Sequence, residues 1–157
     1  MIITFTLNNK DYKMDVDPGM RALDFLRDVM KMKSVKEGCS EGECGACTVI
    51  LNGDAVCSCL LYAGELNNKD IVTSEGLGTP EKMHPIQEAY VEAGGVQCGF
   101  CTPGFVLSTK ALLDKIPNPN EEEIKKALEG NLCRCTGYTK IIDSVKLAAK
   151  IINQVKG

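Results

Sequence analysis

The chain has 157 residues, of which 44% are hydrophobic and 25% charged, and its formal net charge is −3. These values are typical of a soluble globular protein and exclude a disordered chain, a collagen and a coiled coil. No apolar run approaches the ~20 residues of a membrane-spanning helix, and the near balance of charge offers no basic face to nucleic acid. The first ten residues lack the features of a secretory signal, so we expect a cytoplasmic protein with neither membrane nor nucleic acid as a partner.

The first half of the chain shows the patterns of an α+β unit. Alternating apolar and polar residues predict strands, and apolar residues at helical spacing predict a helix after Asp17-Pro18-Gly19. Asparagine-rich turns separate the strands of each hairpin. The expected elements are a hairpin over 3–7 and 12–16, a helix with its apolar face over 22–30, a second hairpin over 48–51 and 54–56, and a short strand over 71–73. This order is compatible with a β-grasp sheet but does not fix its topology.

The second half of the chain is predicted to be helical throughout. Proline at a first helical position, a capping box at Asn120 and Glu123, and a long amphipathic stretch near the C-terminus support this prediction. We expect four helices in a compact bundle, over about 85–93, 102–116, 120–130 and 138–155. The turn-rich segment 74–80 separates the two halves, and we therefore expect two domains, at 1–77 and 78–157.

Nine cysteines and a single histidine set the chemistry of the chain. An odd number of cysteines in a chain expected to be cytoplasmic argues against a disulfide framework, and cysteines at this density more often bind metal. With one histidine available, sulfur must supply most ligands, which favours zinc, copper(I) or an iron–sulfur cluster. That histidine, His84, has no cysteine near it in sequence and precedes Pro85, so we expect it to cap a helix or lie on the surface.

The first cysteine group has the spacing C-x4-C-x2-C at Cys39, Cys44 and Cys47, which is the plant-type pattern for a 2Fe–2S cluster. Neighbouring glycines allow the backbone to wrap tightly around a cluster. The fourth thiolate must come from the next hairpin, at Cys57 or Cys59, which could share a strand face. A zinc ribbon would normally show two CxxC knuckles, and a redox-active CxxC would need a thioredoxin-like βαβ unit, so both alternatives are weaker.

The second group has the spacing C-x2-C at Cys98 and Cys101 and C-x-C at Cys133 and Cys135. Each pair lies in a loop between two predicted helices, and such loops can meet at one end of a bundle. This spacing is not the plant-type pattern, and alone it does not distinguish a 2Fe–2S from a 4Fe–4S cluster.

Longer motifs around the two groups are more selective than the spacings. The first group reads EGCSEGECGACTV and is followed by SCL, and the second reads QCGFCTPG and GNLCRCTGY. Together these motifs resemble the iron–sulfur subunit of the xanthine dehydrogenase, or molybdenum hydroxylase, family over nearly the whole chain. In that family the fourth ligand follows the third after eleven intervening residues, which matches Cys59 and leaves Cys57 as an extra cysteine.

The resemblance implies both the fold and the cofactors. It implies an N-terminal β-grasp, ferredoxin-like domain and a C-terminal four-helix-bundle domain, each with one 2Fe–2S cluster. Gln97 and Cys135 are implied to contact the pterin of a molybdenum cofactor held by another subunit. The implied ligands are Cys39, Cys44, Cys47 and Cys59 for the first cluster and Cys98, Cys101, Cys133 and Cys135 for the second.

The implied function is electron transfer in a multisubunit molybdenum hydroxylase, a xanthine dehydrogenase-type oxidoreductase. Electrons would pass from the molybdopterin site through both clusters to FAD during hydroxylation of an N-heterocycle of the purine or nicotinate type, or of an aldehyde. The implied partners are a large molybdenum-binding subunit, which holds the substrate site, and a FAD-binding subunit, in a heterotrimer or its dimer. The alternatives are a carbon-monoxide dehydrogenase small subunit, a stand-alone two-cluster ferredoxin and a zinc module.

Overall fold

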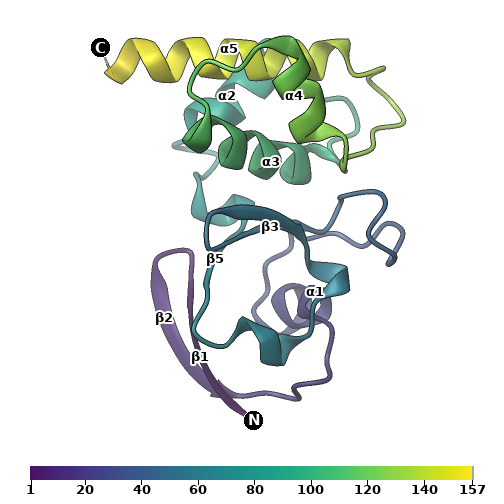
Figure 1. Ribbon diagram of the computed structural model, residues 1–157, viewed down its shortest axis with the longest axis vertical. Coiled ribbons are helices and arrows are strands. Elements are labelled where there is room, and N and C mark those ends of the chain that lie inside the picture. Colours follow the sequence, from purple (N-terminus) through teal and green to yellow (C-terminus); the bar gives the residue numbers. More distant parts are fainter. Residues whose placement is uncertain (157) are drawn as a thin grey trace.

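The computed structural model describes residues 1–156, which form one unit built on a sheet and one unit built of helices (Figure 1). The N-terminus lies at the outer end of the sheet unit, and helix α5 (Thr139–Lys156) lies at the opposite end of the molecule. The α+β class predicted from the sequence is confirmed. Among the helices of residues 1–156, none combines the length and the apolar character of a bilayer span.

Five strands form a mixed sheet in the order β2-β1-β5-β3-β4. Strand β1 pairs antiparallel with β2 and parallel with β5, and β3 pairs antiparallel with β4 and β5. Both predicted hairpins and the short strand are present, and their bounds lie within two residues of the prediction. The strands are β1 (Ile2–Leu7), β2 (Lys10–Asp15), β3 (Thr48–Leu51), β4 (Asp54–Cys57) and β5 (Asp70–Val72).

The first core lies against one face of this sheet. Ile3, Phe5 and Leu7 point into it, because alternate residues of a strand face opposite sides. Phe5 packs edge-on against Phe25, with ring centroids 5.7 Å apart. Three 3-10 helices connect the elements around this core, at Ser58–Leu60, Ala63–Leu66 and Ser74–Gly76.

The helix expected over 22–30 is divided into two parts. Helix α1 covers only Ala22–Asp24, and a π-helical turn follows at Phe25–Val29. The Met30 N–H donates to the Phe25 carbonyl at 2.9 Å, five residues back, which defines the wider turn. Of the predicted apolar face, Ala22, Leu23 and Leu26 are buried, whereas Val29 is 43% exposed because the helix changes type before it. The change of helix type was not predicted.

All four predicted helices of the second half are present. Helix α2 packs on α5, and α3 packs on α4, around a core that includes Tyr90, Phe105 and Ile141. Helix α4 begins with the expected capping box, in which the Asn120 side chain accepts the N–H of Glu123 at 2.9 Å. Besides α5, the helices are α2 (Pro85–Glu92), α3 (Thr102–Lys115) and α4 (Glu121–Leu128).

Helix α3 joins the two units. It lies over β3 (Figure 1), and Leu107 and Ala111 of α3 pack with Ile50 of β3 in a small buried cluster. This contact fixes how the loops of the sheet unit meet the loops of the helical unit.

Candidate iron–sulfur sites

The first cysteine group lies on the loop that leads into β3, where backbone N–H groups point at sulfur. The Cys39 sulfur accepts the N–H groups of Glu41, Glu43 and Cys44 at 3.4, 3.3 and 3.3 Å. The Cys44 sulfur accepts the N–H of Ala46 at 3.4 Å. These hydrogen bonds, led by that from Glu41, lower the pKa of the Cys39 thiol to about 7. The loop therefore stabilises thiolates, as a cluster requires.

Two glycines of this loop are required by close approach. A Cβ on Gly38 would lie 2.6 Å from the Cys44 sulfur, and one on Gly45 would lie 2.3 Å from the Gly130 carbonyl oxygen. Gly45 also has a φ of +71°, a conformation that side chains rarely adopt. The expected tight wrapping of the backbone is thus present.

Both candidates for the fourth ligand lie beside Cys47. The expectation that Cys57 and Cys59 share a strand face is wrong, because β4 ends at Cys57 and Cys59 lies in the following 3-10 helix. The Cys57 thiol donates to the Gly42 carbonyl at 3.8 Å. A carbonyl oxygen would repel a thiolate at this position, so the contact suits a neutral thiol rather than a metal ligand.

The pKa values around Cys47 follow from these contacts. The neighbouring Cys57 thiol is the largest cause that lowers the pKa of the Cys47 thiol, to about 5. The same contact and then burial raise the pKa of the Cys57 thiol. Burial, followed by the neighbouring Cys47, raises the pKa of the Cys59 thiol to about 11, although the N–H of Gly42 acts in the opposite direction.

The second cysteine group is assembled from two loops of the helical unit. Cys101 precedes the first residue of α3, and Cys133 and Cys135 precede α5. Burial and then a contact with Cys133 raise the pKa of the Cys101 thiol to about 12. A hydrogen bond with Cys98 raises the pKa of the Cys135 thiol. Cys101 therefore lies near Cys133, and Cys135 lies near Cys98.

The Cys133 sulfur accepts two hydrogen bonds from one residue. The Thr136 hydroxyl and N–H donate to it at 3.2 and 3.4 Å. Partial burial would raise the pKa of the Cys133 thiol, but the bonds from Thr136, with smaller contributions from Cys135 and Cys101, hold that pKa below its ordinary value. The surroundings of the Cys133 sulfur therefore stabilise negative charge on it.

Direct hydrogen bonds join the two cysteine groups. The N–H of Leu132, next to Cys133, donates to the carbonyl of Cys44 at 2.9 Å. The Asn131 amide, which is only 5% exposed, donates to the Gly45 carbonyl at 3.2 Å, and its oxygen accepts the Ser108 hydroxyl at 2.6 Å. Sequence reasoning assigned no role to Asn131 or Thr136, and their places within the GNLCRCTGY motif were the available signal.

His84 occupies a place that the sequence suggested, and Gln97 lies on the surface beside the second cysteine group. Gln97 is exposed in the bend beside Cys98, and within residues 1–156 its side chain has no hydrogen-bond partner. His84 caps α2, because its Nδ1 accepts the N–H of Ile86 at 3.1 Å. Histidine is thus a structural residue here rather than a ligand of either cysteine group.

The donor set fits 2Fe–2S clusters better than single metal ions. Within residues 1–156, no three His, Cys, Asp or Glu side chains are arranged to hold one metal ion. In a 2Fe–2S cluster each iron takes only two protein ligands, which suits cysteines that meet in pairs. The inward N–H groups and the space left by Gly38 fit the same group.

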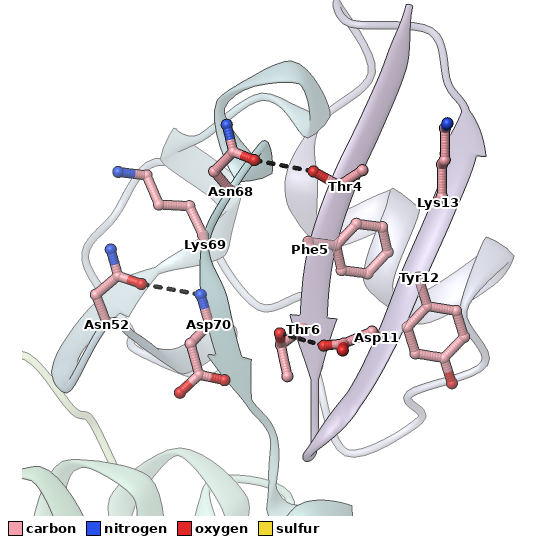
Figure 2. Close-up of a pocket in the computed structure, with 10 residues that line it drawn as sticks. All are labelled: Thr4, Phe5, Thr6, Asp11, Tyr12, Lys13, Asn52, Asn68, Lys69 and Asp70. Atoms are coloured by element: carbon pink, nitrogen blue, oxygen red, sulfur yellow. Dashed lines mark hydrogen bonds between the residues drawn. The ribbon is translucent and has the colours of Figure 1, made fainter.

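A hollow of about 650 Å³ lies on the sheet, away from the cysteines (Figure 2). Its polar side chains bond to one another, as Thr6 does to Asp11 at 2.7 Å and Thr4 does to Asn68 at 2.9 Å. No cysteine or histidine lines it. The hollow therefore contributes nothing to the two cysteine groups.

Comparison with domain families defines the class of protein. Residues 6–92 match a family described as a 2Fe-2S iron-sulfur cluster binding domain, and residues 73–146 match a [2Fe-2S] binding domain. Together these matches cover both cysteine groups, so each half of the chain is a 2Fe–2S binding module.

Individual relatives define the family. The chain is 51% identical to the nicotinate dehydrogenase small FeS subunit of Eubacterium barkeri over 94% of each chain. It is 44% identical to the xanthine dehydrogenase iron-sulfur-binding subunit of Escherichia coli O157:H7 over 91% of each chain. The solved aldehyde oxidoreductase of Desulfovibrio gigas superposes with a TM-score of 0.95 at 40% identity, over 99% of this chain but 17% of that one. The chain belongs to the iron–sulfur subunit family of the molybdenum hydroxylases, to which xanthine dehydrogenase belongs.

Proposed function

We propose that this chain is the electron-transfer subunit of a multisubunit molybdenum hydroxylase. The bonded contact between the two cysteine groups, from the Leu132 N–H to the Cys44 carbonyl, is the observation that carries this proposal. When bound, each cluster accepts and passes on one electron at a time. The proposed ligands are Cys39, Cys44, Cys47 and Cys59 for one cluster and Cys98, Cys101, Cys133 and Cys135 for the other.

We assign one cluster to each of two domains, a β-grasp domain at 1–77 and a four-helix-bundle domain at 78–157. The separate buried cores of the sheet unit and the helical unit support this division. The parallel pairing of β1 with β5 in the centre of the sheet supports the β-grasp topology.

The exposure of the cysteines supports a direction of transfer. Cys98 and Cys135 are exposed, whereas Cys133 is partly buried and adjoins Leu132, which bonds to Cys44. The exposed pair therefore suits entry of electrons from a partner, and the inner pair suits their transfer toward the first group. Gln97, exposed beside Cys98, and Cys135 are the proposed contacts with the pterin on that partner.

Exposed apolar side chains around the second group support a bound partner rather than a stand-alone ferredoxin. Phe100, Leu132 and Tyr138 are 49%, 52% and 39% exposed, and apolar side chains gathered on one surface mark contact sites. We propose a molybdenum-binding subunit at this surface and a FAD-binding subunit beyond the first group, in a heterotrimer or its dimer in the cytoplasm. An N-heterocycle or an aldehyde is the proposed substrate of the assembly.

Metal and sulfide analysis tests this proposal. The purified full chain, or its complex, should contain about four irons and about four inorganic sulfides per chain. Reduction should give two distinct 2Fe–2S signals in electron paramagnetic resonance (EPR). Zinc in place of iron, or a single cluster, would contradict the proposal.

The role of Gln97 predicts a separate defect. Gln97→Ala should leave the iron content of the complex near normal, because an exposed amide is not an iron ligand. Substrate-driven reduction of the second cluster should slow, since a lost hydrogen bond to a buried partner group costs about 1–3 kcal/mol. Rapid-mixing absorbance and molybdenum content would measure this. Wild-type reduction rates at full molybdenum occupancy would show that Gln97 contacts no cofactor.

A further inference from the structure

Three residues of the second cysteine loop form a closed ring of hydrogen bonds. The Thr136 hydroxyl donates to the Cys133 sulfur at 3.2 Å. The same hydroxyl oxygen accepts the N–H of Tyr138 at 3.2 Å. The Tyr138 phenol oxygen then accepts the N–H of Cys133 at 3.0 Å. The ring begins and ends on one proposed cluster ligand.

Tyr138 holds an unfavourable backbone conformation within this ring. Its φ is +73°, and Gly137 before it has a φ of +69°. A bulky side chain rarely adopts this region, and such strain persists only where surrounding contacts maintain it. The contacts here are the two hydrogen bonds of Tyr138 and its ring packing against Phe105, with centroids 6.4 Å apart. These contacts together therefore hold the loop around Tyr138 in one conformation.

The ring orients the Thr136 hydroxyl toward sulfur. Because the oxygen already accepts the N–H of Tyr138, its own hydrogen is free to point at Cys133. Hydrogen bonds in series polarise one another and strengthen each member. The sulfur of Cys133 thus receives a directed and reinforced donor.

We propose that the Thr136 hydroxyl sets the reduction potential of the second cluster through its hydrogen bond to Cys133, and that Tyr138 is the residue that positions it. This inference depends on the proposed function, since it requires a 2Fe–2S cluster on Cys133. One-electron reduction adds negative charge to the cluster. A donor on a ligand sulfur stabilises that added charge and therefore raises the potential.

This donor differs in kind from those at Cys39. The donors to the Cys39 sulfur are backbone N–H groups, which every substitution except proline leaves in place. The Thr136 donor belongs to a side chain, so a substitution can remove it while the ligands remain. A substitution at residue 136 can accordingly change the reduction potential of the second cluster without changing the fold.

An EPR-monitored redox titration of the full chain, or of its complex, tests the proposal. Thr136→Val removes the donor at nearly constant volume, and Thr136→Ser retains it. We expect Thr136→Val to lower the equilibrium constant for reduction of the second cluster by up to about tenfold. For one electron this corresponds to a midpoint potential lower by up to about 59 mV. Thr136→Ser should restore the wild-type value, and the first cluster should not shift in either variant. Tyr138→Phe should give a smaller shift in the same direction.

Each outcome decides the proposal. A Thr136→Val variant with two full clusters and an unchanged second potential would overturn it. If valine prevents cluster retention, Thr136→Ala removes the same donor without adding any γ-methyl group and allows the same measurement. Loss of the cluster from both variants would also overturn the proposal, by showing a role in assembly alone. Absence of iron from the wild-type chain would instead overturn the proposed function, so the two failures are distinguishable.

Discussion

Cys47 has two thiol neighbours, Cys57 and Cys59, and their surroundings favour Cys59 as the proposed fourth ligand. Cys59 is 7% exposed, and the Gly42 N–H acts on its sulfur, whereas the Cys57 thiol donates to the Gly42 carbonyl. An N–H stabilises a thiolate and a carbonyl does not. Cys59→Ser should therefore abolish the EPR signal of the first cluster, and Cys57→Ser should leave both signals intact.

These two serine variants are matched controls for one another, because each replaces one sulfur near Cys47 with oxygen. The second cluster supplies an internal standard in the same spectrum. Loss of the first signal in Cys57→Ser alone would reverse the assignment. Loss in both variants would show that both sulfurs are needed for the first cluster to assemble.

Gly45 allows a matched test of close packing at a single residue. Alanine at Gly45 or at Gly53 places a side chain at a positive φ, which costs about 1–2 kcal/mol at either position. Only at Gly45 would the added carbon meet another atom, the Gly130 carbonyl oxygen at 2.3 Å; nothing lies within 4 Å at Gly53. Gly45→Ala should therefore lower the free energy of unfolding by about 1–3 kcal/mol more than Gly53→Ala.

Denaturant unfolding of the full chain measures that difference. If the free energy of unfolding fell equally in the two variants, the loop at Gly45 would be able to move away from the added carbon. The two units would then not be tightly packed there.

At the residue scale, the sequence predicted which cysteines gather but not how each is held. Spacing identifies Cys39, Cys44 and Cys47 because ligand geometry constrains positions along the chain. It could not place Cys59 on a 3-10 helix, since a two-residue separation also fits one strand face. The place of Thr136 within the GNLCRCTGY motif was the only signal for its hydroxyl, because a hydrogen bond to sulfur leaves no spacing pattern.

At the scale of elements, local signals predicted the helices of the second half well. The capping residues Asn120 and His84 lie where helices α4 and α2 begin, because caps satisfy N–H groups that the helix itself leaves free. The π-helical turn at Phe25–Val29 was not predictable, since its apolar face has ordinary helical spacing.

The His84 cap makes the stability of α2 depend on pH. Burial, and then the charge of Lys110, lower the pKa of His84 below 6.5; Asp114 and Glu88 act in the opposite direction. Only the neutral ring accepts the Ile86 N–H at Nδ1. The stabilisation is therefore present above pH 6.5 and is lost as pH falls through the lower folded-state pKa.

His84→Asn tests this dependence, because asparagine caps a helix without titrating in this range. Between about pH 7.5 and pH 5, the free energy of unfolding should fall more steeply for the wild-type chain than for the variant. All other titrating groups are common to both proteins and cancel in the difference. Parallel pH profiles would show that protonation of His84 does not weaken the cap.

At the scale of the whole molecule, the sequence predicted two halves but not their junction. Ile50, Leu107 and Ala111 look like ordinary core residues of their own halves, yet they meet across the boundary. The Leu132–Cys44 hydrogen bond uses backbone atoms only, and these carry no sequence signal. Long-range placement of this kind depends on tertiary packing, which local patterns do not encode.

Asn131 is the buried side chain that ties the two halves together, and its removal should loosen them. Asn131→Ala leaves the buried Ser108 hydroxyl without its partner, and a buried polar group left unpaired costs about 1–3 kcal/mol. The Gly45 carbonyl loses the Asn131 donor but keeps the N–H and hydroxyl of Thr48. The control is Asn153→Ala. The Asn153 amide bonds to the exposed Pro117 carbonyl, and its loss should cost about 1 kcal/mol or less.

All eight proposed ligands remain in both variants, so both clusters should assemble. In the fully reduced protein, the magnetic coupling between the two clusters, read from the splitting of their EPR signals, should weaken or become heterogeneous in Asn131→Ala alone. Unchanged splitting and unchanged stability would show that the Leu132–Cys44 bond and the apolar contact of α3 with β3 hold the two cysteine groups in place without Asn131.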